Sequence, residues 1–267
     1  MSKIRLDTYL VNNNYVPSRS KASELIHSNK VYVNDKLISK PSFEVDESSN
    51  IKIISNDLLK YVSRGGLKLE KAINIFSLDL SGKVILDIGA STGGFTDCAL
   101  QNDAKKVYSL DVGYDQLHES LRNNDKVINI ENTNFKDVSL SMFDEKIDLY
   151  VCDVSFISIM QILKKLIELD DNFSIVILFK PQFEVGKNNL NKHGVVKNTN
   201  ILIKALNDFA YNLKLMNIGI IDATYSPIIG QKEGNIEYLF YLKKNNTSKN
   251  INFESLVNES YKALKVK

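Results

Sequence analysis

The stretch VILDIGASTGGFTD, residues 84–97, decides the fold of this chain. Val84–Asp87 predict a buried strand, Gly89–Gly93 a glycine turn, and the residues from Gly94 onward a helix. The turn lacks the G-x-G-x-x-G spacing of dinucleotide sites, because Ser91 stands where the second glycine belongs. It also lacks the ending of a P-loop, because Phe95-Thr96 stand where Lys-Ser/Thr must reach a phosphate. Both phosphate-binding fingerprints therefore miss a residue that they require.

Strands and helices alternate outward from this stretch, beginning near residue 64. The predicted strands are Val84–Asp87, Val107–Asp111, Val127–Glu131, Ile147–Asp153, Ile175–Lys180, Ile218–Thr224 and Ile236–Leu242. Helical patterns such as Ile157–Leu169 and Asn200–Leu215 separate most of them. The alternation predicts a doubly wound α/β domain with a mainly parallel seven-stranded sheet. Only the loop Tyr225–Asn235 joins the last two strands, so they are expected to form an antiparallel edge hairpin.

The first 57 residues have a different pattern, typical of a small α+β domain. Helical spacing over residues 4–10 is followed by a second helix that opens with a serine cap at Ser18. Two short strands, Val31–Val33 and Ile51–Ile54, follow. We therefore expect a small domain at 1–57, a linker at 58–63 with a hinge near Asn56, and the α/β domain at 64–267.

Bulk composition limits the classes of protein to consider. The 267 residues are 43% hydrophobic and 25% charged with a net charge of +2, as in an ordinary globular protein. A nucleic-acid surface would have to come from local clusters of Lys and Arg. No signal-peptide pattern opens the chain, and the apolar run 175–179 is too short for a membrane span, so the location is expected to be cytoplasmic. The cysteines and histidines have no metal-ligand spacing, and no metal is expected.

Polar residues at the carboxyl ends of the predicted strands are the candidate reacting groups, because ligands bind there in open α/β sheets. Asp153 and Lys180 each end a strand, Glu237 lies in the last one, and Lys68 lies in the helix before the first. Taken singly, Lys180 could be a snorkelling lysine and Glu237 a solvent-facing strand residue. Asp111 ends the second strand, 24 positions after Asp87, where an acid commonly binds ribose hydroxyls.

The pattern D-x-G-x-x-x-G-G at 87–94 resembles the first motif of Rossmann-like S-adenosylmethionine methyltransferases. The resemblance implies that the glycines let the backbone approach the amino-acid part of S-adenosylmethionine. The cofactor-binding residues that it implies are Asp87, Gly89, Ala90, Ser91, Gly93, Gly94, Asp111, Asn134 and Asp153. A tight turn that binds no ligand is the alternative.

The ordered set Lys68, Asp153, Lys180 and Glu237 is similar to the Lys-Asp-Lys-Glu tetrad of FtsJ-like ribose 2′-O-methyltransferases. The contexts YVSRGGLKLEKA, CDVSFIS, FKPQFEVGK and GNIEYLFYL resemble the TlyA family of bacterial rRNA cytidine 2′-O-methyltransferases, some of which are called haemolysins. The resemblance implies that Lys180 contacts the 2′-oxygen as base or charge stabiliser. Asp153 would orient Lys180 and touch the cofactor, while Lys68 and Glu237 hold the ribose. Two neighbouring lysines are expected to lower each other's pKa.

Two other methylation chemistries fit the sequence less well. Asp153-Val154-Ser155-Phe156 is not the Asn/Asp-Pro-Pro-aromatic motif that commonly serves amine methylation of adenine. Carbon-5 methylation of cytosine needs a cysteine nucleophile. Cys152 should point to the face opposite Asp153, and both Cys152 and Cys98 are expected in the core.

The segment from Arg5 to Val45 resembles the S4 RNA-binding domain, which implies ribosomal RNA or ribosomal subunits as partners. The basic residues expected to contact RNA are Arg5, Arg19, Lys21, Lys30, Lys36, Lys40 and Arg64. Asn29 and Asp35 stand where that family usually has turn glycines, and both tolerate left-handed backbone geometry. The alternative is a dimerisation module with ordinary solvated charges.

The leading hypothesis is 2′-O-methylation of cytidine in 16S rRNA, with 23S rRNA as a second candidate target. A ribosome-assembly factor that has lost catalysis is a second hypothesis, and a membrane-active haemolysin is a third. The lack of a strongly amphipathic cationic stretch argues against the haemolysin. The oligomeric state is left open.

Overall fold

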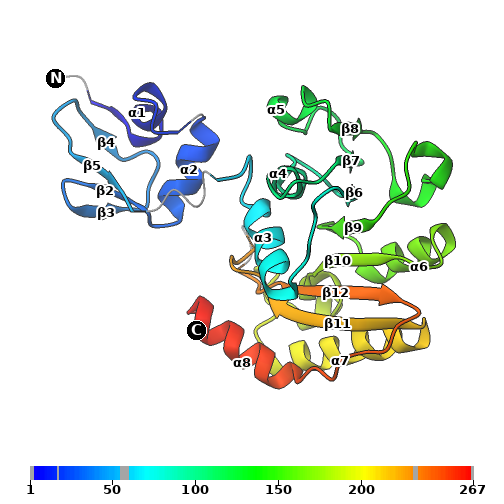
Figure 1. The fold of residues 1–267 in the computed structure, drawn as a ribbon. Helices are drawn as coiled ribbons and strands as arrows, with labels where there is room; N and C mark the ends of the chain where they lie inside the picture. Colours follow the sequence, from blue (N-terminus) through cyan, green and yellow to red (C-terminus); the bar gives the residue numbers. More distant parts are fainter. Residues whose placement is uncertain (1–2, 17, 55–59, 231–233, 266–267) are drawn as a thin grey trace. The chain divides into compact units, whose positions relative to one another are not determined.

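The computed structural model describes residues 3–16, 18–54, 60–230 and 234–265 (Figure 1). The chain divides into two compact units, an N-terminal unit of residues 1–64 and a C-terminal unit of residues 65–267. Of the predicted linker 58–63, residues 58 and 59 lie outside the described residues, and so does the expected hinge at Asn56.

The N-terminal unit packs two helices with short strands. The elements are β1 (Ile4–Arg5), α1 (Leu6–Asn12), α2 (Arg19–His27), β2 (Val31–Val33), β3 (Lys36–Ile38), β4 (Glu44–Val45) and β5 (Ile51–Ile53). The strands form a β3-β2-β5 sheet and a separate β1-β4 pair. Leu6, Leu10 and Leu25 are fully buried, so this unit has a core of its own. Ser18 caps α2 as predicted, because its hydroxyl accepts a hydrogen bond from the backbone N–H of Lys21.

The turns of this unit use the residues expected to replace glycine. Asn29 has φ +57° after α2. Asn34 (φ +48°) and Asp35 (φ +62°) form the two-residue turn between the antiparallel strands β2 and β3. Two consecutive left-handed residues are what a tight hairpin of this kind needs, and Asn and Asp meet that need at low cost.

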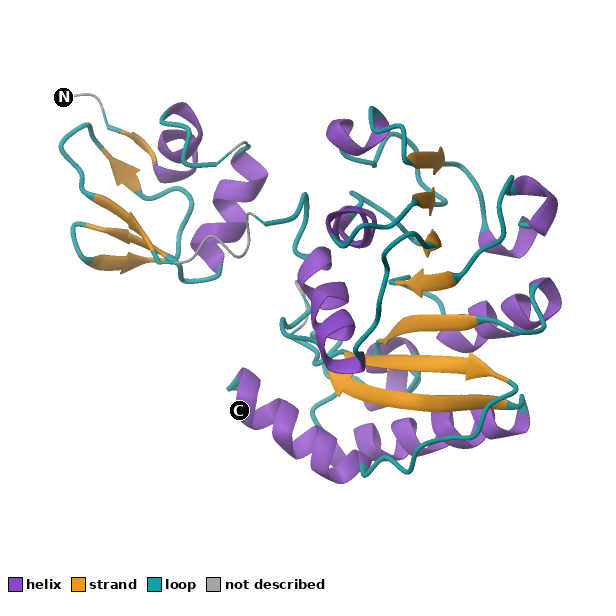
Figure 2. Ribbon diagram, in the orientation of Figure 1, coloured by secondary structure: helices purple, strands orange, loops and turns teal. Residues whose placement is uncertain are grey.

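The C-terminal unit contains a seven-stranded sheet (Figure 2). Its strands are β6 (Val84–Ile88), β7 (Lys106–Leu110), β8 (Val127–Ile130), β9 (Leu149–Cys152), β10 (Ser174–Phe179), β11 (Ile218–Tyr225) and β12 (Tyr238–Lys244). The spatial order is β11-β12-β10-β9-β6-β7-β8. Strands β6 to β10 run parallel, whereas β12 pairs antiparallel with both β10 and β11. The predicted α/β class and the antiparallel edge hairpin are confirmed.

Helices cover both faces of this sheet. They are α3 (Gly65–Phe76), α4 (Gly94–Gln101), α5 (Glu119–Arg122), α6 (Ile159–Leu169), α7 (Thr199–Leu215) and α8 (Phe253–Leu264), with 3-10 turns η2 (Phe135–Asp137), η3 (Leu140–Met142), η4 (Pro181–Phe183) and η5 (Lys187–Asn189). Helices α6, α7 and α8 share one buried cluster with alternate strand residues, whereas α3 and α4 pack together outside that cluster. The C-terminal helix α8 is not among the elements that the sequence predicted.

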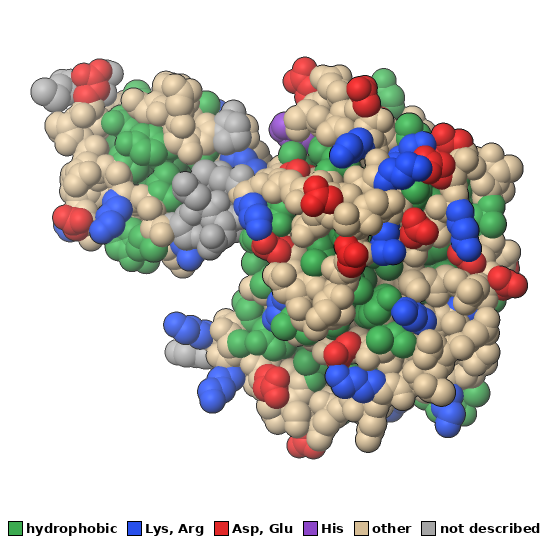
Figure 3. Space-filling model, in the orientation of Figure 1, with side chains coloured by type: hydrophobic (Ala, Val, Ile, Leu, Met, Phe, Trp, Pro, Cys, Tyr) green, Lys and Arg blue, Asp and Glu red, His purple; other side chains and the backbone are tan. Residues whose placement is uncertain are grey.

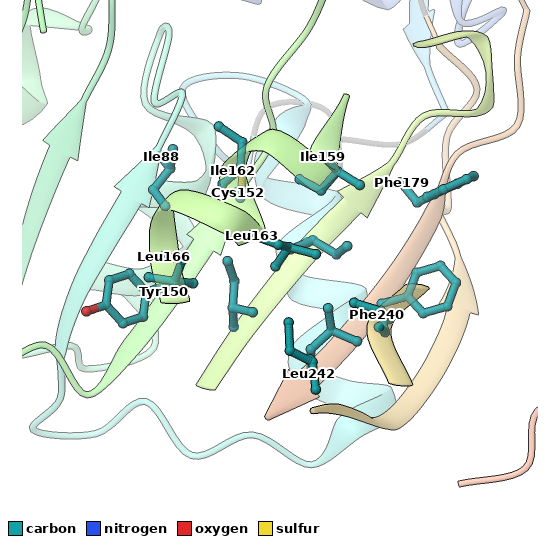
Figure 4. Close-up of a cluster of buried hydrophobic side chains, with 14 of the residues drawn as sticks. Ile88, Tyr150, Cys152, Ile159, Ile162, Leu163, Leu166, Phe179, Phe240 and Leu242 are labelled. Atoms are coloured by element: carbon teal, nitrogen blue, oxygen red, sulfur yellow. The ribbon is translucent and has the colours of Figure 1, made fainter. Parts of the chain in front are cut away.

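Figure 4 shows part of the cluster beneath α6, where Tyr150 and Cys152 of β9 lie against Leu163 and Leu166. Cys152 is fully buried, as is Cys98 on α4, so both cysteines are core residues as predicted. Burial also raises the pKa of the Cys152 thiol. A buried thiol with a raised pKa is a poor nucleophile, which disfavours the cytosine carbon-5 chemistry.

No helix within the described residues is long and apolar enough to span a membrane. Over the C-terminal unit, acidic and basic side chains are interspersed on the face shown in Figure 3. This mixture accords with the small net charge of the chain.

Candidate active site

The glycine turn joins β6 to α4 through a series of left-handed residues. Gly89, Ser91 and Gly93 have φ values of +83°, +50° and +92°. A Cβ atom on Gly89 would lie 3.0 Å from Val154 Cγ1, and one on Gly93 would lie 2.3 Å from Leu121 Cδ1. Both positions therefore favour glycine for backbone geometry, and Gly93 requires it for packing as well. Ala90 is buried, and Gly94 is the first residue of α4.

Asp111 ties this turn to the end of β7. Its carboxylate accepts hydrogen bonds from the backbone N–H of Ser91 (2.8 Å) and of Gly113 (2.7 Å). Asp111, predicted as the ribose-binding acid, therefore lies beside the glycine turn and stabilises the conformation of that turn. Asn134, also predicted to bind the cofactor, is exposed after β8, and its side chain caps the 3-10 turn η2.

Asp87 lies beneath the turn and is fully buried. The hydroxyl of Thr96 donates a hydrogen bond to its carboxylate (2.7 Å). The pKa of Asp87 is raised to about 7, chiefly by burial and also by the nearby negative charges of Asp153 and Asp111, against the lowering effect of the Thr96 hydrogen bond. Three carboxyl groups thus gather where β6, β7 and β9 end. Such a site disfavours an anionic ligand such as phosphate.

The Lys-Asp-Lys-Glu set also lies at the carboxyl ends of the parallel strands. Asp153 directly follows β9, Lys180 directly follows β10, and Glu237 directly precedes β12. Strand β12 is antiparallel to β10, and Phe179 pairs with Tyr238. Lys180 and Glu237, each one residue beyond this pair, therefore meet where β10 ends and β12 begins. Lys68 reaches the same point from α3. The structure brings all four predicted residues together.

The four side chains form a linear chain of ion pairs. Lys68 Nζ lies 2.9 Å from Glu237 Oε2 and 3.0 Å from Asp153 Oδ2. Lys180 Nζ lies 2.6 Å from Asp153 Oδ1. The exposed fractions of the side chains are 8% for Lys68, 18% for Asp153, 9% for Lys180 and 5% for Glu237. Two cations and two carboxylates balance at a nearly buried site, as the cost of burying charge requires.

This arrangement sets the protonation of the two central groups. Burial alone would raise the pKa of Asp153, but Lys68 and Lys180 outweigh it and lower that pKa to about 2. Burial alone would lower the pKa of Lys68, but Asp153 and Glu237 outweigh it and raise that pKa. The expectation that neighbouring lysines lower each other's pKa is therefore wrong for Lys68, because a shared carboxylate lies between the two ammonium groups.

A lysine with a lowered pKa does occur one turn along α3. Burial lowers the pKa of Lys71 to about 8. Its Nζ lies 3.3 Å from the centre of the Tyr225 ring. Residues three apart on a helix lie on the same side, so Lys71 is a neighbour of Lys68. The sequence offered no signal that would separate these two lysines.

Two residues of the loop after β9 also belong to this neighbourhood and were not predicted. The hydroxyl of Ser155 accepts a hydrogen bond from Lys180 Nζ at 2.7 Å. Phe156 is 88% exposed, has φ +65°, and packs its ring 5.3 Å from that of Phe183. Left-handed geometry in a non-glycine, bulky residue is strained and often marks a functional site. Only their position next to Asp153 could have pointed to these residues.

In the N-terminal unit, Arg5 and Arg19 converge on one buried acid, Asp7. Arg5 donates to both oxygens of Asp7 (3.0 and 2.8 Å), and Arg19 Nη2 lies 3.0 Å from Oδ2. Arg5, and with it Arg19, hold the pKa of Asp7 well below its usual range despite burial. The arginine side chains remain 49% and 60% exposed. Both guanidinium groups are thus fixed in place and still face solvent.

The other predicted RNA-contacting residues differ in their surroundings. Lys21 is buried, and its ammonium donates a hydrogen bond to the carbonyl of Tyr61 at 2.8 Å. This bond stabilises the N-terminal unit itself. Lys36 and Lys40 are exposed, whereas Lys30 and Arg64 are partly buried. A polar backbone partner and the long apolar stem explain how a lysine of α2 comes to be buried.

Comparison with known proteins gives two family matches. The model of the FtsJ-like methyltransferases matches residues 61–244, and that of the S4 domain matches residues 4–51.

Several relatives resemble the chain over most of its length. It is 42% identical to Hemolysin A of Brachyspira hyodysenteriae (88% of this chain, 98% of the relative). It is 41% identical to the 23S rRNA (cytidine-2′-O)-methyltransferase TlyA of Campylobacter jejuni (85% and 95%) and 35% identical to the 16S/23S enzyme of Mycobacterium tuberculosis (90% and 90%). A putative hemolysin from Streptococcus thermophilus has a similar structure, with a TM-score of 0.77 at 36% identity (99% and 98%).

Proposed function

Because the chain belongs to the FtsJ-like methyltransferases and, among them, to the TlyA family, we propose that it methylates cytidine ribose in ribosomal RNA at the 2′-oxygen. S-adenosylmethionine is the proposed methyl donor. The proposed targets are 16S and 23S rRNA, since the Campylobacter relative is named for 23S rRNA and the Mycobacterium relative for both.

The observation that carries this proposal is the chain of ion pairs Glu237–Lys68–Asp153–Lys180 beside the glycine turn. Asp153 belongs to both parts of the site, because it follows β9 and its backbone carbonyl lies against Gly89. A methyl donor held at the turn would therefore lie next to Lys180. That proximity is what transfer to a hydroxyl requires.

When bound, S-adenosylmethionine supplies an activated methyl group on a positively charged sulfur. Gly89 and Gly93 shape the backbone that would hold it, and Asp111, beside the turn, would accept hydrogen bonds from its ribose. Lys180 contacts the 2′-oxygen of the substrate, as base or as charge stabiliser. Lys68 remains an ammonium ion, and its role is to hold Asp153 and Glu237 in position.

Two features support RNA as the substrate. Arg5 and Arg19 present fixed, solvent-facing guanidinium groups, which suit phosphate oxygens. Phe156 offers an exposed aromatic ring three residues after Asp153, and unpaired bases stack on such rings. Arg5 and Arg19 are therefore proposed to position the RNA, and Phe156 to hold the base.

The test is methyl transfer from tritiated S-adenosylmethionine to separated, unmodified ribosomal subunits, followed by digestion of the RNA and identification of the labelled nucleoside. We expect label in 2′-O-methylcytidine. Label on a base would contradict the assigned chemistry. If S-adenosylhomocysteine binds but neither subunit is labelled, the enzymatic proposal fails in favour of an assembly factor.

Within this assay, Lys180→Ala should reduce transfer by at least about 100-fold, as loss of a group acting on the moving proton commonly does. Binding of S-adenosylhomocysteine, measured by titration calorimetry, should be spared. Lys204→Ala is the matched control, because Lys204 is exposed on α7 and pairs only with Asp208 among the described residues. Turnover retained in Lys180→Ala would remove this lysine from the central role.

A further inference from the structure

We propose that Ser155 is a positioning residue for Lys180, an inference that rests on the proposed function. A lysine ammonium has three N–H groups in a tetrahedral arrangement. For Lys180, Ser155 Oγ accepts one of them at 2.7 Å, whereas Asp153 Oδ1 lies 2.6 Å from Nζ as an ion-pair partner without hydrogen-bond geometry. The ion pair draws Nζ toward Asp153. The hydrogen bond to Ser155 sets the direction of the N–H groups.

Asp153 alone cannot fix that direction. An ion pair without hydrogen-bond geometry leaves the ammonium group free to rotate about the Cε–Nζ bond. The hydrogen bond to Ser155 Oγ restricts this rotation. One of the remaining positions on Nζ can then face the 2′-oxygen, whose proton would be shared with Lys180.

The loop holds Ser155 in place from both sides. Val154 lies against Gly89, where an added Cβ atom would be 3.0 Å from Val154 Cγ1. Phe156 packs on Phe183, which belongs to the turn η4 directly after Lys180. Ser155 is exposed, but its hydroxyl is therefore anchored relative to both the glycine turn and Lys180. Without such anchoring, an exposed serine would bond to water in place of Lys180.

Ser155 is also the partner that distinguishes the two lysines. Lys68 lies between two carboxylates, whereas Lys180 shares one carboxylate and bonds to a neutral hydroxyl. Lys180 thus has one ion-pair partner where Lys68 has two, and the neutral Ser155 hydroxyl is the partner that orients it.

The experiment compares Ser155→Ala, Ser155→Thr and the control Ser158→Ala in the intact protein. Ser155→Ala should lower kcat about tenfold, the effect of one hydrogen bond to a charged group, while KM for ribosomal subunits and for S-adenosylmethionine is unchanged. The pH profile of kcat should shift as well. Ser155→Thr keeps the hydroxyl and should restore most of the rate. Ser158 caps α6 and bonds to Glu184, so Ser158→Ala should lower the melting temperature with kcat and its pH profile unchanged.

A readout that needs no methyl transfer separates this proposal from the proposed function. In protein labelled with ¹⁵N-lysine, the Nζ resonance of Lys180 is assigned by its absence in Lys180→Met. Ser155→Ala should shift that resonance and speed its hydrogen exchange, with little change at Lys68. If the wild-type protein methylates no rRNA but this shift occurs, the positioning role stands and the function is wrong. An unchanged resonance together with a wild-type kcat overturns the positioning role.

Discussion

At the scale of single residues, the site is governed by one shared carboxylate. Asp153 bonds to Lys68 with one oxygen and to Lys180 with the other, and its pKa falls to about 2 as a result. The two lysines therefore have different electrostatic surroundings although both are nearly buried. Lys68 lies between two acids and has a raised pKa, so it suits a structural role. Residue type alone does not reveal this division.

Asp87 provides a pH test at the same scale. Its pKa is raised from 3.8 to about 7, chiefly by burial, so the folded protein keeps a proton that the unfolded chain loses above pH 4. Stability from this group is present at low pH and lost as the pH rises from about 4 to 7. Asp87→Asn removes the titration and keeps an acceptor for Thr96. We expect urea unfolding to show the variant gaining stability relative to wild type over this window, by up to about 4 kcal/mol. A difference that is flat with pH would contradict the assignment.

At the scale of elements, the turn between β6 and α4 depends on what lies beneath it. Leu117 and Leu121 approach Gly93 so closely that a Cβ atom would lie 2.7 and 2.3 Å from their Cδ1 atoms. Both leucines are buried and have little freedom to move aside. The turn is thus shaped by its own left-handed backbone and also by the segment around α5.

Gly93→Ala tests this support. The left-handed φ costs about 1–2 kcal/mol for alanine, and overpacking against the leucines adds about 1–3 kcal/mol. Affinity for S-adenosylhomocysteine should fall at least tenfold, because the displaced turn is the proposed cofactor site. Gly82→Ala is the matched control: Gly82 has φ +70° but nothing within 4 Å of the added Cβ, so only the backbone cost should appear. Equal destabilisation in urea, with affinity unchanged, would show that the leucines do not matter.

At the scale of the whole molecule, the chain consists of two units with separate hydrophobic cores. The N-terminal unit buries Leu6, Leu10 and Leu25, whereas the core of the other unit lies between its sheet and helices α6, α7 and α8. The proposed RNA contacts Arg5 and Arg19 depend on Asp7 in the first unit, and the proposed chemistry depends on residues of the second. Substrate recognition and catalysis can therefore be perturbed separately.

Scanning calorimetry of the intact protein should show two unfolding transitions, since each core is expected to melt as a unit. S-adenosylhomocysteine at 100 times its Kd should stabilise only the transition of the C-terminal unit, by about 2.7 kcal/mol. Asp7→Asn weakens the bonds from Arg5 and Arg19 and should lower only the other transition. A single transition that responds to both changes would mean that the units unfold together.

The sequence by itself determined the α/β class and the strand order along the chain, and its resemblance to the FtsJ-like tetrad identified the four residues that meet at the strand ends. This was possible because a buried strand, a glycine turn and polar strand ends are local patterns of period and composition. The same holds for the turns at Asn29 and Asp35, since left-handed backbone geometry limits residue type locally.

Only the tertiary structure decided which lysine lies between two acids, that Ser155 bonds to Lys180, that Lys71 has the lowered pKa, and that Lys21 is buried. Each of these depends on groups far apart in sequence: 85 positions separate Lys68 from Asp153, and 25 separate Lys180 from Ser155. Charge and proton affinity depend on distance and on exclusion of water, and both are set when the strands and helices pack. A linear pattern identifies the groups that take part, whereas the packed fold determines what each group is bonded to.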